Sequence, residues 1–261
     1  MHARHLLHAL SMALLLLPLP SLAESIEDVG SRDVSIRLLV GIPNSPVAVV
    51  VLFAGGHGAL NIRDDGQFGW GRGNFLVRSR KLFQEQGITT VVIDAPSDKI
   101  STGLYHFRNS ADHARDVAAV IRHLRARFSL PVWLVGTSRG TESVANAAIR
   151  LKTDLPDGIV LTSSMLAYNK NGTQLLFMEL ETITVPTLIV HHKSDECSVT
   201  PYDGVESLRS KLISSRKIDV LEYQGGTPKG GVCDAFHYHG YHGIEANVIK
   251  DISDWIKAYS P

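Results

Sequence analysis

The chain has 261 residues, of which 44% are hydrophobic and 20% are charged. These fractions are ordinary for a globular protein and exclude a disordered or fibrous chain. The 26 Lys and Arg residues balance 26 Asp and Glu residues, so the formal net charge is +0. A neutral chain gives no electrostatic reason to expect nucleic acid or an anionic membrane surface as a partner.

The N-terminus has the pattern of an export signal. Arg4 precedes an apolar run from Leu6 to Leu17, and Ser21-Leu22-Ala23 then places small residues at positions −3 and −1 of a cleavage site. The run is shorter than the roughly 20 residues that span a bilayer. Residues 1–23 are therefore predicted to be a signal peptide, which makes the protein periplasmic or secreted, with a buried N-terminal helix as the alternative. No later stretch reads as a membrane span.

After the signal, short apolar runs rich in β-branched residues alternate with amphipathic patterns. Apolar runs of this kind are typical of strands buried on both faces. Their alternation with helices predicts an α/β fold, a mostly parallel sheet covered on both faces, formed by residues 24–261 as one domain. The expected strands are Ser35–Val40, Val47–Phe53, Thr89–Ile93, Val132–Val135, Gly158–Leu161, Thr187–His191 and Ile218–Tyr223. The expected helices cover residues 74–86, 110–128, 139–151, 201–214 and 243–258.

Three segments fit neither pattern simply. Gly55–Gly73 and Gly225–Tyr241 are glycine-rich, and each follows a predicted strand. They are expected to be long loops at strand C-termini, where α/β sheets bind ligands. The apolar segment 164–182 is interpreted either as a small cap over the site or as a buried helix. The helix is favoured because core helices are common.

A nucleophile is predicted at the fourth of these strands. Val132–Val135 runs directly into Gly136-Thr137-Ser138-Arg139-Gly140, and a helix follows. Gly-x-Ser-x-Gly between a strand and a helix is typical of a nucleophile elbow, whose tight turn needs small flanking residues and exposes the serine hydroxyl. Ser138 is therefore the predicted nucleophile, with a structural serine in a strand–helix turn as the alternative.

A serine hydroxyl becomes a good nucleophile only when a base takes its proton and a carboxylate orients that base. In chain order the carboxylate follows a later strand and the histidine follows the last one. Asp195, after the strand at 187–191, is the predicted acid. It is preferred to Glu196 because a short side chain on a turn is more easily held rigid. The alternative is that Asp195 only caps this turn.

Three histidines follow the last strand, and one of them should be the base. His239 is favoured over His237 and His242 because Gly240 beside it lets the chain turn sharply. His242 stands one residue before the final helix, and His237 lies close to Cys233. The other two histidines are expected to line the site or to form hydrogen bonds.

Acyl transfer also requires donors for the developing oxyanion. The backbone N–H of Arg139, directly after the nucleophile, is one expected donor. The other should come from the glycine-rich loop after Val47–Phe53, where Gly56 is favoured, with Gly55 and His57 as alternatives. The same glycines resemble a dinucleotide-binding fingerprint only weakly, because Asn61 stands where the third glycine belongs. No cofactor is therefore expected.

The chain contains two cysteines, Cys197 and Cys233. In an exported protein an even pair without metal-ligand spacing suggests a disulfide, and the alternative is two buried thiols. A bond between them would tie the loop that carries Asp195 to the loop that carries the histidines.

These motifs together resemble the α/β-hydrolase superfamily. The likeness rests on Gly-Thr-Ser-Arg-Gly at 136–140, on Asp195 and on His239-Gly240-Tyr241, and it extends over nearly all of the chain after the signal. The resemblance implies hydrolysis of an ester or related acyl bond in a small molecule by Ser138, His239 and Asp195.

Within the superfamily the chain looks like the exported, dienelactone-hydrolase-like esterases. The segments 74–78 and 94–98 add to this likeness, although the sequence suggests no chemical role for them. Dienelactone hydrolases proper use a cysteine nucleophile, whereas serine stands at position 138 here. The resemblance therefore does not imply a lactone substrate.

Two other classes of function remain open. His237, His239 and His242 have metal-ligand spacing, and His191, His192, Asp195 and Cys197 could complete a zinc site. Tyr241, however, stands where the comparable metallo-β-lactamase run has an aspartate. The second alternative is a non-catalytic binding protein, because a fold does not fix function. The order of the three triad residues and the glycine-rich loop favour the hydrolase.

Overall fold

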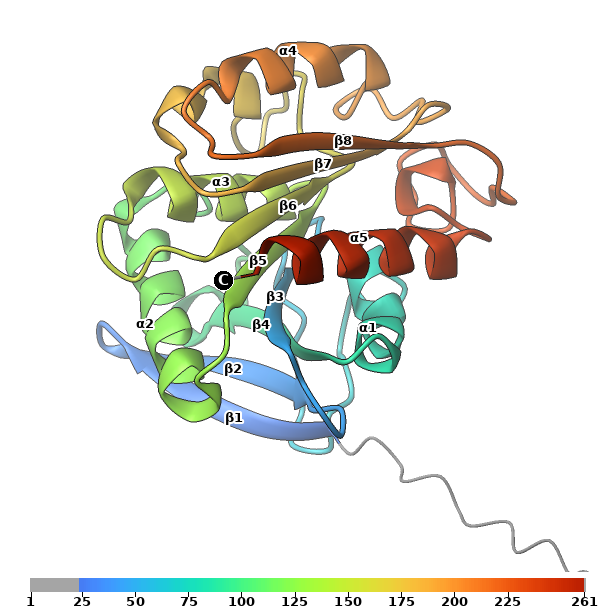
Figure 1. Cartoon of the computed structure of the whole chain (residues 1–261). Helices are drawn as coiled ribbons and strands as arrows, with labels where there is room; N and C mark the ends of the chain where they lie inside the picture. The colour runs from blue at the N-terminus through green and yellow to red at the C-terminus, as the bar shows by residue number, and fades with distance from the viewer. Residues whose placement is uncertain (1–23, 261) are drawn as a thin grey trace, which may run out of the picture.

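The computed structural model describes residues 24–260 (Figure 1). The predicted signal peptide lies outside the described residues. The strands form one eight-stranded sheet in the order β1-β2-β4-β3-β5-β6-β7-β8. They are β1 (Glu24–Ser31), β2 (Val34–Gly41), β3 (Ala48–Phe53), β4 (Ile88–Pro96), β5 (Val132–Thr137), β6 (Gly158–Thr162), β7 (Thr187–His192) and β8 (Ile218–Tyr223).

The sheet is mostly parallel, as the alternating pattern predicts. From β4 to β8 every neighbouring pair is parallel, while β2 runs antiparallel to both β1 and β4. Strand β1 at the edge was not expected from the sequence. It is largely polar, and Val29 is its one buried residue, so it lacks the apolar run by which the other strands are recognised.

Helices cover both faces of the sheet. Helices α1 (Phe75–Glu85) and α5 (Glu245–Tyr259) pack on one face, and α2 (Ala111–Phe128), α3 (Gly140–Arg150) and α4 (Val205–Lys211) on the other (Figure 1). Alternate side chains of β3 enter the two apolar layers, with Val50 and Leu52 on the α1 side. In the part of the chain that the structure describes, no helix is both long and apolar enough to cross a membrane.

The expectation of a buried helix over residues 164–182 is wrong. The segment is irregular and contains only two short 3₁₀ helices, Leu175–Phe177 and Leu180–Thr182. Leu175 is buried, whereas Phe177 is 79% exposed. The polar stretch from Asn169 to Gly172 interrupts the apolar pattern, because the Asn169 side chain accepts a hydrogen bond from the backbone of Asn171 and forms a turn.

The expected helix over residues 201–214 is shorter than predicted. It consists of a 3₁₀ turn, Tyr202–Gly204, followed by α4.

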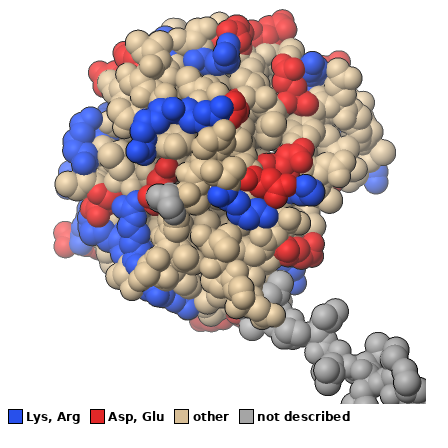
Figure 2. Space-filling view, viewed as in Figure 1, with Lys and Arg blue, Asp and Glu red and all other residues tan. Residues whose placement is uncertain are grey.

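Acidic and basic side chains are interspersed on the face of the molecule shown in Figure 2, in line with the balanced composition.

A buried histidine in α2 makes stability depend on pH. His113 packs against the rings of Phe53 and Phe107, and neither of its ring nitrogens has a hydrogen-bond partner in the described part of the chain. Burial, together with the nearby Arg108 and Arg32, lowers the pKa of His113 to about 3. The unfolded chain binds this proton near pH 6.5, so acidification below about pH 6.5 favours unfolding.

We therefore expect His113→Phe to lose less stability in acid than the wild type. Between pH 7.5 and pH 5 the decrease in the free energy of unfolding should be smaller by about 2 kcal/mol, the cost of keeping this histidine neutral at pH 5. Urea denaturation at the two pH values measures it. His106→Asn, at an exposed turn, is the control and should behave like the wild type. The same acid loss in His113→Phe as in the wild type would contradict the assignment.

Candidate active site

The turn after β5 has the geometry of a nucleophile elbow. Ser138 has φ 52°, in the left-handed region that non-glycine residues rarely adopt. A Cβ atom at Gly140 would lie 2.1 Å from the carbonyl oxygen of Phe53, so the start of α3 packs against the sheet at a distance that only glycine permits. The local sequence thus places the Ser138 side chain at the carboxyl edge of the central strands.

The structure brings Asp195 and His239 together beside this turn. Asp195 follows β7, and His239 lies in a 3₁₀ turn, Tyr238–Gly240, after β8. The Nδ1 atom of His239 is 3.0 Å from Oδ2 of Asp195, and both residues are buried. Since Nδ1 faces a carboxylate, it carries the proton, and Nε2 is left as the basic nitrogen.

Two further side chains lie beside the Asp195 carboxylate. The Thr200 hydroxyl donates a hydrogen bond to Oδ2 of Asp195 at 3.0 Å and lies 3.1 Å from Nδ1 of His239. The Nε2 atom of His191 lies 3.6 Å from the same carboxylate oxygen. Burial by itself raises the pKa of Asp195, but the interactions with His191 and His239 outweigh it and hold the pKa well below its usual value. Asp195 is therefore ionised at neutral pH.

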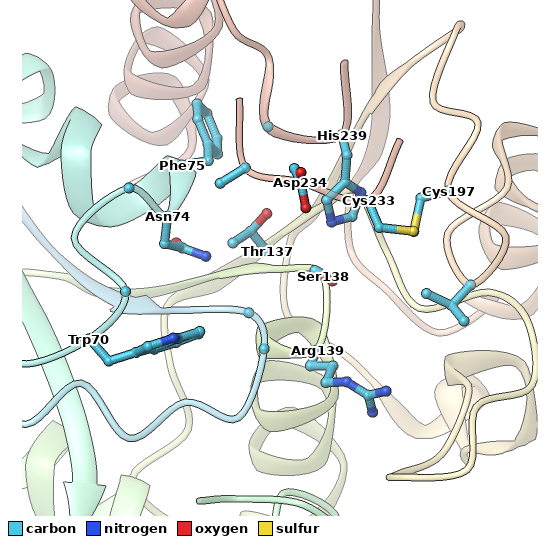
Figure 3. A pocket seen from close by; sticks show the side chains of 17 residues that line it. Trp70, Asn74, Phe75, Thr137, Ser138, Arg139, Cys197, Cys233, Asp234 and His239 are labelled. Atoms are coloured by element: carbon cyan, nitrogen blue, oxygen red, sulfur yellow. A yellow bond between two sulfur atoms is a disulfide. The ribbon is translucent and has the colours of Figure 1, made fainter. Parts of the chain in front are cut away.

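Ser138, the predicted nucleophile, and His239, the predicted base, line the same pocket. In Figure 3 the imidazole of His239 is directed toward Ser138. The Ser138 hydroxyl faces Sδ of Met165 at 3.9 Å, and within residues 24–260 it makes no hydrogen bond with His239. Such contacts are often long without substrate and tighten when one binds.

The other two histidines of the cluster lie elsewhere. Nδ1 of His242 is 2.6 Å from the carbonyl oxygen of Thr227, and the ring of His237 packs edge-on against Tyr238. Tyr241 is buried and donates a hydrogen bond to Val190. Within the described residues, no group of three or more His, Cys, Asp or Glu side chains is arranged to hold a metal ion. These positions do not fit the zinc site considered from the spacing.

The structure contains the disulfide between Cys197 and Cys233. Cys197 stands two residues after Asp195, and its backbone N–H donates to the other carboxylate oxygen of Asp195 at 3.1 Å. Cys233 belongs to the loop that leads to His239. The bond therefore joins the loop of the acid to the loop of the histidine, and both sulfur-bearing residues line the pocket in Figure 3.

Ser138 and His239 open into a pocket of about 520 Å³. The glycine-rich loop after β3 forms one wall, where Gly56 has φ 59°. Within residues 24–260, the backbone N–H groups of Gly56 and Arg139 donate to no other residue. Both predicted donors belong to residues that line the pocket. The pocket is lined by Gly55, Gly56, Trp70, Gly71, Gly73, Asn74, Phe75, Thr137, Ser138, Arg139, Cys197, Val199, Cys233, Asp234, Ala235, His239 and Gly240.

Asp94, at the end of β4, supports the glycine-rich loop, a role that was not evident from the sequence. Its carboxylate accepts hydrogen bonds from the backbone N–H groups of Leu60 at 2.6 Å and Ile62 at 2.7 Å. Burial raises the pKa of Asp94, and these backbone donors partly offset the effect. An acidic residue near the end of a fully buried strand was the available signal.

Arg78 in α1 connects the two loops of the site. Its guanidinium donates to the carbonyl oxygens of Gly73 at 2.7 Å and Gly240 at 2.6 Å, and it forms an ion pair with Glu245 at 2.9 Å. Gly240 follows His239 directly. Arg78 thus holds the histidine loop against the loop before α1, which gives a structural reason for the arginine in segment 74–78.

Solved structures with the same architecture include several hydrolases. A dienelactone hydrolase from Anabaena variabilis has a TM-score of 0.66 at 15% identity, covering 92% of this chain and 99% of that chain. An α/β serine hydrolase homologue from Coxiella burnetii has a TM-score of 0.63 at 18% identity, with coverage of 89% and 97%. A lidless α/β serine hydrolase from Xanthomonas campestris has a TM-score of 0.62 at 15% identity, with coverage of 94% and 98%.

Sequence comparison contributes nothing further, since no protein-family model and no curated protein matches the chain. The structural similarity covers 89% to 94% of this chain in these three comparisons. At these identities it establishes the architecture, and the chain has the α/β-hydrolase fold.

Proposed function

We propose that the protein is an exported serine hydrolase that cleaves the ester bond of a small molecule through an acyl-enzyme intermediate. One observation carries the proposal. The Asp195–His239 pair, 3.0 Å apart, lies beside a serine held on a strained elbow, and Ser138 and His239 line one pocket. The serine hydrolases from Coxiella burnetii and Xanthomonas campestris, which share this fold, support the proposal.

In the first step His239 acts as the base. Its Nε2 atom takes the proton of Ser138, and Oγ attacks the ester carbonyl carbon. Asp195 remains ionised and stabilises the imidazolium that forms. The negative charge on the carbonyl oxygen is stabilised by the N–H groups of Gly56 and Arg139, which are held in place before the reaction begins.

In the second step His239 acts as the acid. It returns the proton to the leaving alkoxide, and the alcohol departs from an acyl group bound to Ser138. A water molecule then gives its proton to His239 and attacks the acyl carbon. As the second tetrahedral intermediate collapses, His239 returns this proton to Oγ of Ser138, which releases the carboxylic acid and restores the serine.

Covalent labelling tests the proposal directly. A fluorophosphonate should react with Ser138 in equal stoichiometry, and hydrolysis of 4-nitrophenyl butanoate should disappear in proportion to labelling. Peptide mapping by mass spectrometry identifies the labelled serine. Activity that survives complete labelling but is lost with a chelator would favour a metal hydrolase. A protein that neither reacts nor hydrolyses esters would favour a binding function.

Export is part of the same proposal, with residues 24–261 as the mature domain. The disulfide supports it, because such bonds persist mainly outside the reducing cytosol. Cleavage after Ala23 predicts that the exported protein begins at Glu24. The intact mass of that protein measures the cleavage site, and an uncleaved chain would contradict the assignment.

A further inference from the structure

The pocket has two sides relative to Ser138. Figure 3 shows Trp70 and Asn74 on one side and the Cys197–Cys233 disulfide on the other, next to His239. In ester hydrolysis the leaving alkoxide must lie against the imidazole that protonates it. The acyl substituent then extends away from His239, toward Trp70 and Asn74. We refer to this side, formed by Trp70, Gly71, Gly73, Asn74 and Phe75, as the acyl side.

Trp70 forms a fixed wall of the acyl side. A Cβ atom at Gly56 would lie 2.4 Å from Cη2 of Trp70, so the indole packs directly on the backbone that is proposed to hold the oxyanion. The indole also packs against the ring of His57, with 3.8 Å between ring centroids. Trp70 nevertheless remains 40% exposed as a residue, which leaves surface available to a substrate.

The position of Trp70 is determined by the loop that Asp94 supports. The backbone N–H of Trp70 donates to the carbonyl oxygen of Leu60 at 3.0 Å, and the N–H of Leu60 donates to Asp94. These hydrogen bonds fix the backbone of Trp70, and the indole itself packs on Gly56 and on the ring of His57. Long acyl chains should therefore meet a barrier at Trp70.

Asn74 supplies a polar group on the same side. Its Oδ1 atom accepts the hydrogen bond of Leu76 N–H at the start of α1, 3.2 Å away, which turns Nδ2 toward the pocket. Nδ2 would lie 3.5 Å from a Cβ atom at Gly55, a position that is itself 3.0 Å from Cβ of Ser138. Within residues 24–260 this amide donates no hydrogen bond, so the acyl side presents an available donor.

We propose that the acyl side selects esters of short acyl groups that carry an oxygen atom. Trp70 limits the length of the chain, and Nδ2 of Asn74 donates a hydrogen bond to an ether, hydroxyl or carbonyl oxygen on the acyl group. This inference rests on the proposed ester hydrolysis and names the substrate class for it.

The first test varies chain length with a constant leaving group. The ratio of kcat/KM for 4-nitrophenyl octanoate to that for the butanoate should rise at least about tenfold in Trp70→Ala, since each methylene that becomes buried contributes about fourfold. Phe177→Ala, which removes an exposed aromatic side chain from the segment after β6, is the matched control. If Trp70→Ala keeps the wild-type ratio, Trp70 does not limit the acyl chain.

The second test compares two esters of nearly equal shape, 4-nitrophenyl methoxyacetate and 4-nitrophenyl butanoate. Asn74→Ser retains an oxygen that can cap α1 but removes the amide donor. The ratio of kcat/KM for the methoxyacetate to that for the butanoate should fall about fivefold relative to the wild type, the effect of one ordinary hydrogen bond. Comparing ratios between the two proteins cancels the difference in intrinsic reactivity of the esters.

The outcomes separate this inference from the proposed function. An equal loss on both esters in Asn74→Ser would mean that the amide serves the reaction centre or the loop, and would overturn the selection of an acyl oxygen. Unchanged ratios in an enzyme that still requires Ser138 would overturn the inference alone. A wild-type protein that hydrolyses none of these esters would overturn the proposed function and the inference together.

Discussion

Ser138→Ala should abolish ester hydrolysis, with kcat/KM reduced at least about 10³-fold, as for other hydrolases that lose the nucleophile of a triad. The physical reason is that no other group reaches the carbonyl carbon from the elbow. Alanine keeps the Cβ atom, so the strain at φ 52° stays the same and the fold should be retained. Initial rates with 4-nitrophenyl butanoate, together with a thermal melt of each protein, measure the effect.

Ser164→Ala is the matched control for this variant. Ser164 is buried just after β6, and its hydroxyl has no hydrogen-bond partner in the part of the chain that the structure describes. This variant should retain most of the wild-type rate. Near-normal turnover in Ser138→Ala would exclude Ser138 as the nucleophile and, with it, the acyl-enzyme mechanism.

His239→Ala should lose activity about as completely as Ser138→Ala. Without the imidazole, Ser138 keeps its proton and Asp195 has no base to orient. The double variant should be scarcely less active than either single one, because the residues of a triad act as a unit. Measuring kcat/KM for the two single variants and the double variant tests this lack of additivity, with near-ultraviolet circular dichroism as the check on folding.

His237→Ala and His242→Ala are the controls within the same loop. Neither ring contacts Asp195, and Nδ1 of His242 is occupied by Thr227. Each variant should retain at least roughly a tenth of the activity, in the range often seen for residues that support a site from outside. If His242→Ala is inactive while His239→Ala is active, His239 is not the base. The serine mechanism would still stand.

The sequence by itself determined the structural features that depend on residues adjacent in the chain, namely the buried strands and the elbow. Apolar, β-branched runs predict the buried parallel strands, because both faces of each strand must be covered by helices. The elbow at 136–140 also follows from local sequence, since its glycines are required wherever a helix packs so closely behind a strand. Strand β1 was not predicted, because an edge strand with a polar face lacks the apolar, β-branched run that identifies the other strands.

Only the tertiary structure decided which side chains of the site contact one another. Three histidines within six residues offer the same chemistry, and only the folded loop brings His239, and not its neighbours, to Asp195. The roles of Thr200, Asp94 and Arg78 were likewise invisible, because each acts on residues far away in the sequence. For Arg78 the separation from Gly240 is 162 residues.

In the segment 164–182 the sequence predicts which residues are buried, whereas the tertiary structure decides the path of the backbone. Its apolar residues predict burial, and Met165 and Leu175 are buried. Their spacing does not establish a helix, because the turn at Asn169 redirects the chain and the carbonyl oxygen of Met165 accepts the N–H of Leu175 instead of an intrahelical partner. Local sequence sets backbone preferences and burial, whereas hydrogen bonds between distant segments form only when the sheet places their loops at one edge.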